Sequence, residues 1–406
     1  MSFRTVTDAQ LVQQLFRLYY ERRYVDVFQP FSFERREFGY MPFGQRVMVR
    51  HLSFRNFDDL RKMLVREAPL HVYRSAALYQ YPQAPMEEKG WLGAELIFDI
   101  DADHLETSCK QGHDYYLCLS CGRRTGEKTQ RCGGCGGEVA EVKMVCDTCL
   151  GKTKQELLRL IDFMENDFGL SSFTVSFSGN RGYHLAVEAE EVLELGRDAR
   201  QEIVDYVTGS HIGIGFHGLP ASSASHAPDY SDPGWRGRIA RGVRRIVLET
   251  SSGDDERLSR LLGPRQVEEL RSISSLWRER PRWELLKQGK RSQQLEKLVA
   301  LSVDDAASHV DTVVTTDVHR LLRLADTLNG KTGLRAMVVS RDLLEDFNPL
   351  RDAVALPEEP LLAVKVFHTP SFMLGDNVYG PWENQAQKLP AYAAVYLLCK
   401  GLATLA

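Results

Sequence analysis

The amino-acid sequence predicts a mixed α/β chain of the α+β kind, with short sheets flanked by helices. Three observations carry this prediction: apolar residues recur at helical spacing in some segments, they alternate with polar residues in others, and cysteines gather in one region. Of the 406 residues, 43% are hydrophobic and 26% are charged. That composition is typical of a folded chain with a sizeable core, and the length favours two or three domains.

The first predicted element is an N-terminal helix. Thr7 and Gln10 form a capping box, and apolar side chains then recur at helical spacing. We expect this helix to pack on a sheet. Three strand-like segments follow: "RREFGYMPF" at 35–43, "RVMVRHL" at 46–52 and "AELIFDI" at 94–100.

The middle of the chain continues the alternation of helices and strands. An amphipathic helix is predicted at 153–168, and residues 173–187 read as a β-hairpin with a glycine-containing turn. From about 250 to 303 the chain is charged and helical, which indicates an inserted helical subdomain. A last helix is expected at 317–328.

The charge and the apolar pattern exclude some classes of protein. The net charge of −4 excludes a globally basic nucleic-acid coat, although a basic groove is compatible with it. We find no apolar stretch of about 18 residues, the length that a membrane helix needs. The N-terminal residues lack the basic and then apolar order of a signal peptide. We therefore expect a cytoplasmic protein without a membrane partner.

Seven of the eight cysteines lie between positions 109 and 149. In a cytosolic chain, reduced thiols at CxxC spacing favour tetrahedral Zn²⁺ over disulfides, and a redox pair or buried free thiols are the alternatives. Cys399 stands apart and is interpreted as a core residue. Seven cysteines and one histidine suffice for two four-coordinate zinc sites: Cys109, His113, Cys118, Cys121, Cys132, Cys135, Cys146 and Cys149.

The segment "ELIFDIDAD" at 95–103 ends an apolar run with carboxylates. Asp99 and Asp101 fall on the same face of a strand, where their repulsion is tolerable if a cation lies between them. Mg²⁺ or Mn²⁺ prefers such oxygen ligands, and two ions can activate a hydroxyl and hold a triphosphate, as in a polymerase. A solvated acidic turn or a helix cap is the alternative.

Two further segments supply groups suited to phosphate. "SGNRGYH" offers Ser178, Arg181 and His184, with a surface β-turn as the alternative. "VDTVVTTDVHRLLRLADTLNGKTG" adds Asp311 on an expected short strand. His319 and Arg320 are interpreted as ordinary helix-surface residues. The same segment also contains the donors Arg323, Asn329 and Lys331.

With these motifs in place, the chain resembles the small catalytic subunit of archaeal and eukaryotic DNA primase. The motifs occur in the order of that family over nearly the whole chain. They are "RREFGY" at 35–40, "FDIDAD" at 98–103, "VCDTCL" to "DFG" at 145–169, "SFSGNRGYH" at 176–184, "GWRGRI" at 234–239, "VDTVVTTDVHRLLRL" to "GKTGL" at 310–334 and "PAYAAVYLLCKGLA" at 390–403.

The resemblance implies an enzyme that synthesises short RNA primers de novo on single-stranded DNA from ribonucleoside triphosphates. It implies a heterodimer with a large, iron–sulfur-containing subunit. It also implies a primase core of mixed sheets flanked by helices, with a zinc-binding knob beside the active site. On this basis we expect the core at 1–103, 151–249 and 304–406, the knob with an inserted zinc ribbon at 104–150, and the helical subdomain at 250–303.

The resemblance also implies roles for individual residues. Asp99, Asp101 and Asp311 match the family's metal-binding acids. The triphosphate contacts match Ser178, Arg181 and His184, Arg323 stands where a basic contact is usual, and Arg36 and Glu37 lie in the "REF" motif. Two positions depart from the family pattern: Asn329 replaces a usual His, and Asn180 replaces a frequent Arg.

The zinc ligands divide into nested sets under this resemblance. Cys109, His113, Cys146 and Cys149 fit the knob, with His104 as a competitor of His113. The four cysteines between them, Cys118, Cys121, Cys132 and Cys135, resemble an inserted zinc ribbon. We therefore predict two zinc ions.

A basic run at 235–245, "WRGRIARGVRR", is the candidate template contact. Its arginines recur mostly at helical spacing and would follow a nucleic-acid backbone, with a solvated or salt-bridged helix face as the alternative. They are Arg236, Arg238, Arg241, Arg244 and Arg245.

Two other functions share part of this pattern. A primase-like polymerase of end-joining repair or plasmid replication would share the three acids. A non-catalytic zinc-ribbon nucleic-acid adaptor would explain the cysteines but leave the acids without a purpose.

Overall fold

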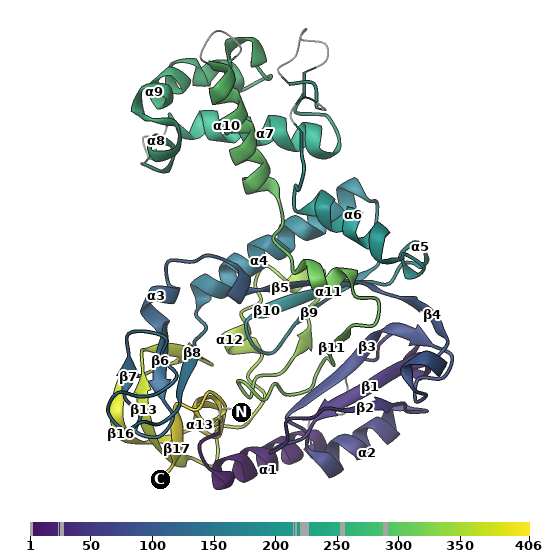
Figure 1. Cartoon of the computed structure of the whole chain (residues 1–406), viewed down its shortest axis with the longest axis vertical. Coiled ribbons are helices and arrows are strands. Elements are labelled where there is room, and N and C mark those ends of the chain that lie inside the picture. Colours follow the sequence, from purple (N-terminus) through teal and green to yellow (C-terminus); the bar gives the residue numbers. More distant parts are fainter. Residues whose placement is uncertain are drawn as a thin grey trace. The chain divides into compact units, whose positions relative to one another are not determined.

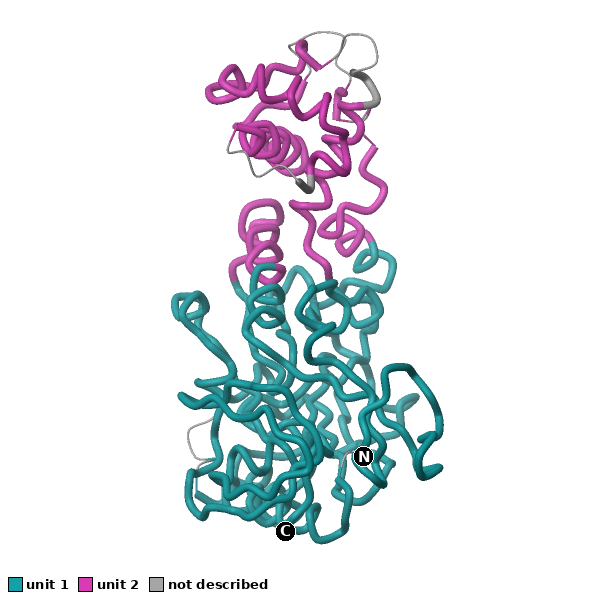
Figure 2. Tube along the Cα trace, turned by 90° about the vertical axis from the view of Figure 1, so that its left-hand side faces the viewer, with its two compact units in different colours: residues 1–155, 172–201, 310–406 teal, residues 156–171, 202–309 magenta. Residues whose placement is uncertain are grey.

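A computed structural model describes residues 3–22, 24, 28–213, 215, 217–219, 227–251, 256–286 and 291–406 (Figure 1). The chain divides into two compact units. Unit 1 comprises residues 1–155, 172–201 and 310–406, and unit 2 comprises residues 156–171 and 202–309 (Figure 2). Of the helices that can be described, none is long and apolar enough to cross a membrane.

The first sheet of unit 1 has five strands in the order β11-β3-β1-β2, with β4 also pairing with β3. All of these pairings are antiparallel. Strand β11 comes from the C-terminal third of the chain, so distant segments complete one sheet. The strands are β1 (Arg36–Met41), β2 (Val49–Leu52), β3 (His71–Tyr79), β4 (Trp91–Ala94) and β11 (Leu321–Arg323).

The second sheet of unit 1 has the order β12-β9-β10-β5. Its strands are β5 (Leu96–Asp101), β9 (Phe173–Phe177), β10 (Gly182–Val187) and β12 (Met337–Val338). Buried apolar side chains from both sheets form a common cluster, which fixes one sheet against the other. The cluster consists of Ala76, Ile97, Ala186, Val314 and Leu322.

Smaller sheets complete the strands of unit 1. They follow the orders β16-β13-β17, β14-β15 and β7-β6-β8. Tyr115 on β6 donates its hydroxyl to the carbonyl oxygen of His368 on β13 at 2.9 Å, so the cysteine-rich sheet contacts β13. The bounds are β6 (Asp114–Cys118), β7 (Arg124–Thr125), β8 (Val139–Lys143), β13 (Leu362–Thr369), β14 (Phe372–Leu374), β15 (Asn377–Tyr379), β16 (Trp382–Leu389) and β17 (Ala403–Leu405).

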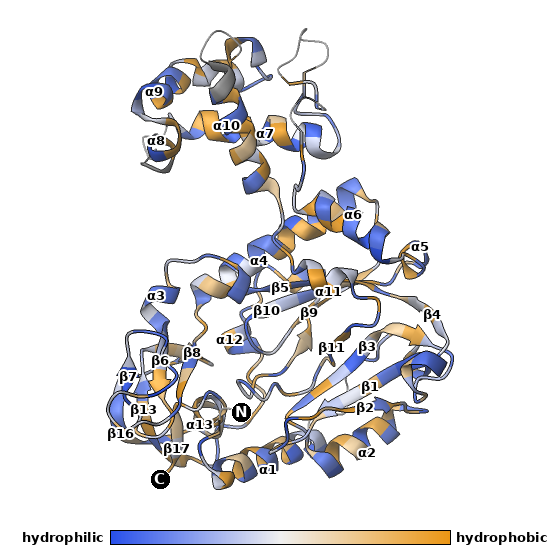
Figure 3. Ribbon diagram, in the orientation of Figure 1, coloured by the Kyte–Doolittle hydropathy of each residue, from blue (hydrophilic) through white to orange (hydrophobic). Residues whose placement is uncertain are grey.

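Helices of two kinds flank these sheets. Surface helices such as α2 bury one face and show both hydrophilic and hydrophobic residues (Figure 3). Helix α13 is buried along its whole length, including Cys399, which confirms the core assignment of that cysteine. The helices are α1 (Val6–Arg22), α2 (Phe57–Glu67), α3 (Lys110–His113), α4 (Asp147–Asp162), α5 (Glu190–Leu193), α6 (Arg197–Val207), α11 (Thr312–Thr316), α12 (Pro349–Asp352) and α13 (Ala391–Cys399).

Unit 2 is helical over its described residues, apart from the turns that connect its elements. Helix α10 packs along α7, where a Cβ on Gly242 would lie 2.6 Å from the Cβ of Ser302. The absence of a side chain on Gly242 therefore allows the two helices to approach closely. The helices are α7 (Gly234–Glu249), α8 (Glu256–Leu262), α9 (Pro264–Ile273) and α10 (Arg291–Ala306), with short 3-10 helices at Ser274–Trp277 and Trp283–Leu286.

The predicted N-terminal helix and hairpin are confirmed, with one correction at the first helix. Thr5 and Asp8 form the reciprocal cap, because each backbone N–H donates to the side chain of the other at 3.0 Å. The helix therefore begins at Val6, and the capping box is not made by Thr7 and Gln10. Residues 173–187 form β9, the turn and β10 as expected.

The helix predicted at 317–328 is wrong. Leu321, Leu322 and Arg323 instead form β11, which pairs with Tyr73–Ser75 of β3. Sheet pairing overrides the helical spacing of this short apolar run. The helix predicted at 153–168 begins earlier, as α4, and ends in a π-helical turn at Phe163–Asp167.

Candidate active site

Strands β5 and β10 position the first two carboxylates. The strands pair with Asp99 opposite His184 and Asp101 opposite Gly182. A Cβ on Gly182 would lie 2.3 Å from the carbonyl oxygen of Ile100, so a side chain there would force the strands apart beside Asp101. The Nε2 atom of His184 lies 3.6 Å from Oδ1 of Asp99.

The third carboxylate, Asp311, is attached to the same strand by the backbone. Its N–H donates to the carbonyl oxygen of Asp99 at 2.9 Å. Its Oδ1 accepts from the N–H groups of Val313 at 3.0 Å and Val314 at 3.4 Å, as the N-cap of α11. The expected short strand at Asp311 is therefore wrong, because this residue begins a helix.

Ser178 opens the turn between β9 and β10. Its Oγ accepts from the N–H of Gly182 at 3.3 Å. Gly179 has a φ of 75°, and a Cβ there would lie 2.8 Å from the Cβ of Asn329. Asn329 donates from Nδ2 to the carbonyl oxygen of Ser178 at 2.9 Å, and Thr332 donates from Oγ1 to that of Gly179 at 2.5 Å. These bonds join two turns that are distant in the sequence.

The second of these turns carries Lys331. The N–H of Lys331 donates to Oδ1 of Asn329 at 3.0 Å, and the N–H of Gly330 donates to Nδ1 of His71 at 3.2 Å. Both ends of the Asn329 amide are thus engaged by backbone groups, so this side chain holds the turn. Lys331 itself is exposed.

A cavity of about 250 Å³ brings most of the predicted residues together. It is also lined by Tyr73 and Arg320, which sequence reasoning missed. Arg320 was hidden by the wrong helix assignment, and Tyr73 lies on β3, a strand that was not predicted. The predicted residues that line the cavity are Asp99, Asp101, Ser178, His184, Arg323, Asn329 and Lys331.

The cavity combines a repelled carboxylate with a neutral imidazole. Burial, followed by repulsion from Asp101 and Asp311, raises the pKa of the Asp99 carboxyl to about 7. Burial, followed by the cation of Arg323, lowers the pKa of His184 to about 4. At neutral pH the imidazole is therefore uncharged and does not neutralise the acids.

Arg323 supplies a buried cation on the other side of the cavity. Its guanidinium carbon lies 4.6 Å from the ring centroid of Tyr73, in a cation–π contact. Its Nη1 is buried without a hydrogen-bond partner, and burial lowers the pKa of this guanidinium. The donor therefore remains free for a ligand in the cavity.

Arg181 is placed differently from the other predicted phosphate contacts. It is 2% exposed and forms an ion pair with Asp103. Its Nε lies 3.9 Å from Oδ1 of Asp101, and its Nη1 donates to the carbonyl oxygen of Met144 at 3.1 Å. Carboxylates and a backbone carbonyl thus surround this guanidinium, and it lines a neighbouring cavity instead.

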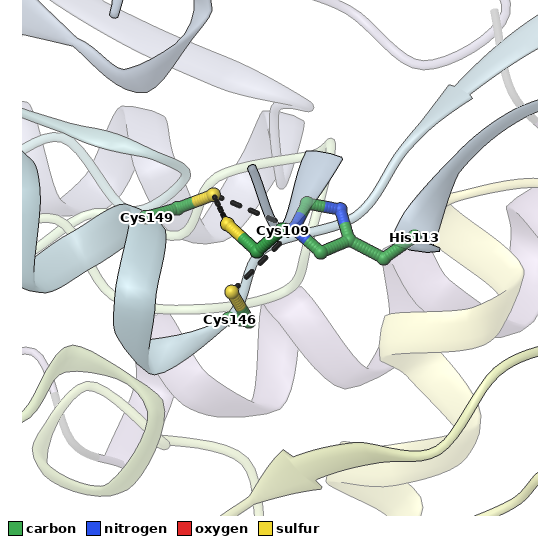
Figure 4. A group of neighbouring side chains, drawn as sticks. All are labelled: Cys109, His113, Cys146 and Cys149. Atoms are coloured by element: carbon green, nitrogen blue, oxygen red, sulfur yellow. Dashed lines mark hydrogen bonds between the residues drawn. The ribbon is translucent and has the colours of Figure 1, made fainter. Parts of the chain in front are cut away.

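The structure brings the first cysteine set together around one point (Figure 4). The sulfurs of Cys109 and Cys149 lie 3.3 Å apart, and Nε2 of His113 lies 3.4 Å from the sulfurs of Cys146 and Cys149. Nδ1 of His113 lies 2.8 Å from Oδ1 of Asp114, a pairing that orients metal-binding imidazoles. The donor set fits one tetrahedral zinc ion.

A second set of four cysteines lies within the inserted ribbon. The sulfurs of Cys118 and Cys135 are 3.5 Å apart, and those of Cys121 and Cys132 are 3.8 Å apart. A tetrahedral zinc with Zn–S bonds of about 2.3 Å places its sulfurs ~3.8 Å apart. In the part of the chain that the structure describes, only these two sets bring three or more ligating atoms within 4.8 Å of one another.

The competitor His104 lies away from both sets. Its side chain is 64% exposed, and its Nε2 lies 3.9 Å from Oδ2 of Asp311. The imidazole that faces the knob cysteines is therefore that of His113.

Helix α7 carries the arginines of the basic run. Arg238 is 9% exposed, and its guanidinium bonds to Asp162 at 2.5 Å and to Asp167 at 2.9 Å. Arg236 bonds to Asp232 at 3.0 Å, while the exposed Arg241 donates to the carbonyl oxygen of Tyr230 at 2.7 Å. Arg238 is thus part of a salt-bridged support, which was the alternative interpretation of this run.

Comparisons with known proteins identify relatives of this chain. The family described as DNA primase small subunit matches residues 136–341. The chain is 32% identical over 408 residues to the DNA primase small subunit PriS of Cenarchaeum symbiosum, covering 98% of this chain and 99% of the relative. It is 34% identical over 414 residues to that of Methanothrix thermoacetophila, covering 96% of each. The polymerase domain of Mycobacterium tuberculosis ligase D in complex with DNA aligns over 83% of each chain at 10% identity, with a TM-score of 0.31.

The two curated relatives place the chain among the polymerase-type nucleotidyltransferases of DNA replication. The chain belongs to the DNA primase small subunit family.

Proposed function

We propose that the protein synthesises short RNA primers on single-stranded DNA by two-metal nucleotidyl transfer, with the 250 Å³ cavity as its active site. The observation that carries this proposal is that Asp99 and Asp101 line one cavity with groups suited to a triphosphate, while a backbone hydrogen bond attaches Asp311 to Asp99. Repulsion among the three carboxylates, which contributes to the raised pKa of Asp99, fits a site made for divalent cations.

The carboxylates would hold two Mg²⁺ or Mn²⁺ ions. When bound, such ions lower the pKa of a 3′-hydroxyl and neutralise charge on the phosphates of the incoming nucleotide. Asp99 and Asp101 present their oxygens from one strand, and the backbone bond between Asp311 and Asp99 keeps the third carboxylate beside them. The metal ligands are thus fixed before substrate arrives.

The remaining residues would bind and orient the triphosphate. Arg323 and Lys331 provide positive charge. Ser178 provides a hydroxyl donor, and His184, whose imidazole is neutral, provides an uncharged N–H donor. Asn329 acts through the turn that it holds. Arg181, engaged by Asp101 and Asp103, is a positioning residue for the acidic strand end.

Two Zn²⁺ ions would hold the knob and the ribbon in their folded form. Each of the two donor sets has four ligands, as closed structural sites do. Cys146→Ser and Cys121→Ser should each remove one zinc ion per chain, measured by metal analysis. One zinc in the native chain, unaltered by Cys121→Ser, would exclude the ribbon site.

The partners would be the primase large subunit in a heterodimer, single-stranded DNA template and ribonucleoside triphosphates, in the cytoplasm. Relatives named as a primase small subunit support a large-subunit partner. For the template we retain Arg241, whose guanidinium is exposed, and to a lesser degree Arg236. The ion pairs of Arg238 remove it from the proposed contacts.

The test is primer synthesis on single-stranded DNA with labelled ribonucleotides and Mn²⁺. The zinc-loaded chain, with the large subunit supplied, should make short RNA, and Asp99→Asn combined with Asp101→Asn should make none. The exposed Asp342→Asn is the matched control and should behave as the native chain does. Absence of product from the native chain would overturn the proposal.

A further inference from the structure

A larger cavity adjoins the proposed active site within unit 1. Its volume is about 570 Å³, within the range of small-molecule sites. Asn180 and Lys331 line both cavities, so the two share a boundary. The side-chain oxygen of Asn180 is buried without a hydrogen-bond partner.

Positive charge accumulates around this second cavity. Its two acids are already engaged, because Lys143 lies 3.0 Å from Asp103 and 3.9 Å from Glu141. Arg181 also pairs with Asp103. The acids therefore leave little negative charge to offset further cations.

Three other cations line the cavity without an ion pair among the residues that the structure describes: Arg46, Lys331 and Lys400. Lys400 donates from Nζ to the carbonyl oxygen of Lys143 at 2.9 Å, and the ring of Tyr396 lies below it. Burial, followed by the charges of Arg181 and Lys331, lowers the pKa of Lys400 to about 7. An anion in the cavity would relieve this repulsion.

The position of the cavity indicates which anion would reach it. Lys331 lies at the boundary and is a proposed triphosphate contact. In an in-line displacement the 3′-hydroxyl attacks the α-phosphorus from the side opposite the leaving group. The hydroxyl oxygen forms the new bond to the α-phosphorus and its proton passes to solvent. The bond from the α-phosphorus to the bridging oxygen breaks, that oxygen takes the electron pair, and pyrophosphate leaves on the side of the triphosphate contacts.

We propose that the 570 Å³ cavity is a polyphosphate-binding site, formed by Arg46, Lys331 and Lys400, next to the active site. This inference rests on the proposed function. The ligand has two possible sources with the same chemistry: the pyrophosphate released by the reaction, or the triphosphate of a second nucleotide. The apolar side chains of Phe3 and Val142 on the cavity wall suit the base of the second source.

The experiment uses Lys400→Met and Arg46→Gln in the full chain with the large subunit supplied. Lys388→Met, at an exposed position of β16, is the matched control. Inhibition by inorganic pyrophosphate is measured during extension of a preformed primer. The KM for nucleotide is measured with and without that primer, and zinc content and thermal midpoint establish that each variant is folded. Because Arg46 is exposed, Arg46→Gln should fold, and it provides the test if Lys400→Met does not fold.

If pyrophosphate is the ligand, the inhibition constant for pyrophosphate rises about tenfold in each variant, while the KM in primed extension stays within about twofold. If a second nucleotide is the ligand, the KM rises about tenfold in unprimed synthesis only. Variants that match Lys388→Met in every measurement overturn the inference while leaving the proposed function intact. An inactive native chain overturns the function itself.

Discussion

The 250 Å³ cavity of unit 1 and the cluster of Arg238, Asp162 and Asp167 in unit 2 both contain arginines and aspartates, but these pair with one another only in the cluster. In the cluster, one guanidinium meets two carboxylates at bonding distance, so each of the three charged groups has a partner of opposite charge within the protein. In the cavity, Asp99 is repelled by its neighbouring acids, and Arg323 leaves a buried donor unpaired. Charge that the fold leaves uncompensated is therefore found at the proposed ligand site, and paired charge is found where side chains hold helices together.

The strongest test of this comparison is Asp101→Asn in the cavity. We expect turnover in primer synthesis to fall about a thousandfold or more, because a proposed ligand of the catalytic ions loses its charge. The asparagine retains the oxygen that accepts from the N–H of Asp103, so the thermal midpoint should be unchanged or higher. Turnover above a tenth of the native value would contradict the proposed role.

The matching change in the cluster is Arg238→Met. We expect the free energy of unfolding to fall by about 3–5 kcal/mol, because Asp167, only 5% exposed, is left without its cation. Turnover of the folded fraction should change by less than about twofold. Urea unfolding measures the first quantity, and Arg238→Met with Asp167→Asn should recover part of it. A weaker and less salt-dependent template affinity at unchanged stability would return Arg238 to the template contacts.

Arg323→Met sharpens the comparison on the cationic side of the cavity. Loss of a buried, unpaired donor should raise the KM for nucleotide about 10- to 100-fold. Stability should change little, because the guanidinium leaves no carboxylate behind. Arg351→Met, which removes an exposed arginine paired with Asp352, is the control and should leave KM as it is. Steady-state kinetics of primed extension measure both variants.

The smallest expected effect is a pH dependence of stability without added Mg²⁺ or Mn²⁺. The pKa of Asp99 is about 7 in the folded state and about 4 in the unfolded chain. Between these values the folded state binds a proton that the unfolded state has lost, so the free energy of unfolding falls as pH rises from about 4 to 7. Urea midpoints at several pH values should show a smaller decline in Asp99→Asn. Equal slopes would show that the pKa of Asp99 is not raised in the folded state.

Much of this organisation was predictable because it depends on local patterns. The hairpin around "SGNRGYH", the buried strand before Asp99 and the CxxC pairs each have a short-range pattern. The division of the ligands into two nested sets came from the family resemblance, and the structure groups the same residues. The strand β11 was missed because three residues pair with β3, which is distant in the sequence, and the local spacing indicated a helix. Tyr73 and Arg320 were missed for the same reason, since only that pairing brings them to the cavity.

The sequence also did not predict which charged side chains form ion pairs in the folded protein. Arg181, Arg238 and Arg323 are each an arginine in a predicted phosphate- or template-binding motif, and the sequence does not distinguish their surroundings. Their carboxylate partners, or the lack of them, come from tertiary contacts. A motif therefore identifies the residue type at a site, and the fold decides whether that residue is available to a ligand.

The backbone bond between Asp99 and Asp311 has a consequence for synthesis of the protein itself. More than half of the chain separates the two residues, so a ribosome must translate the intervening sequence before the third acid can join the other two. A nascent or truncated chain that ends before Asp311 contains both cysteine sets but lacks the third acid and the residues of β11 that line the cavity. Incomplete products would compete for metal without being able to polymerise, and the order of translation delays reactivity until most of the protein exists.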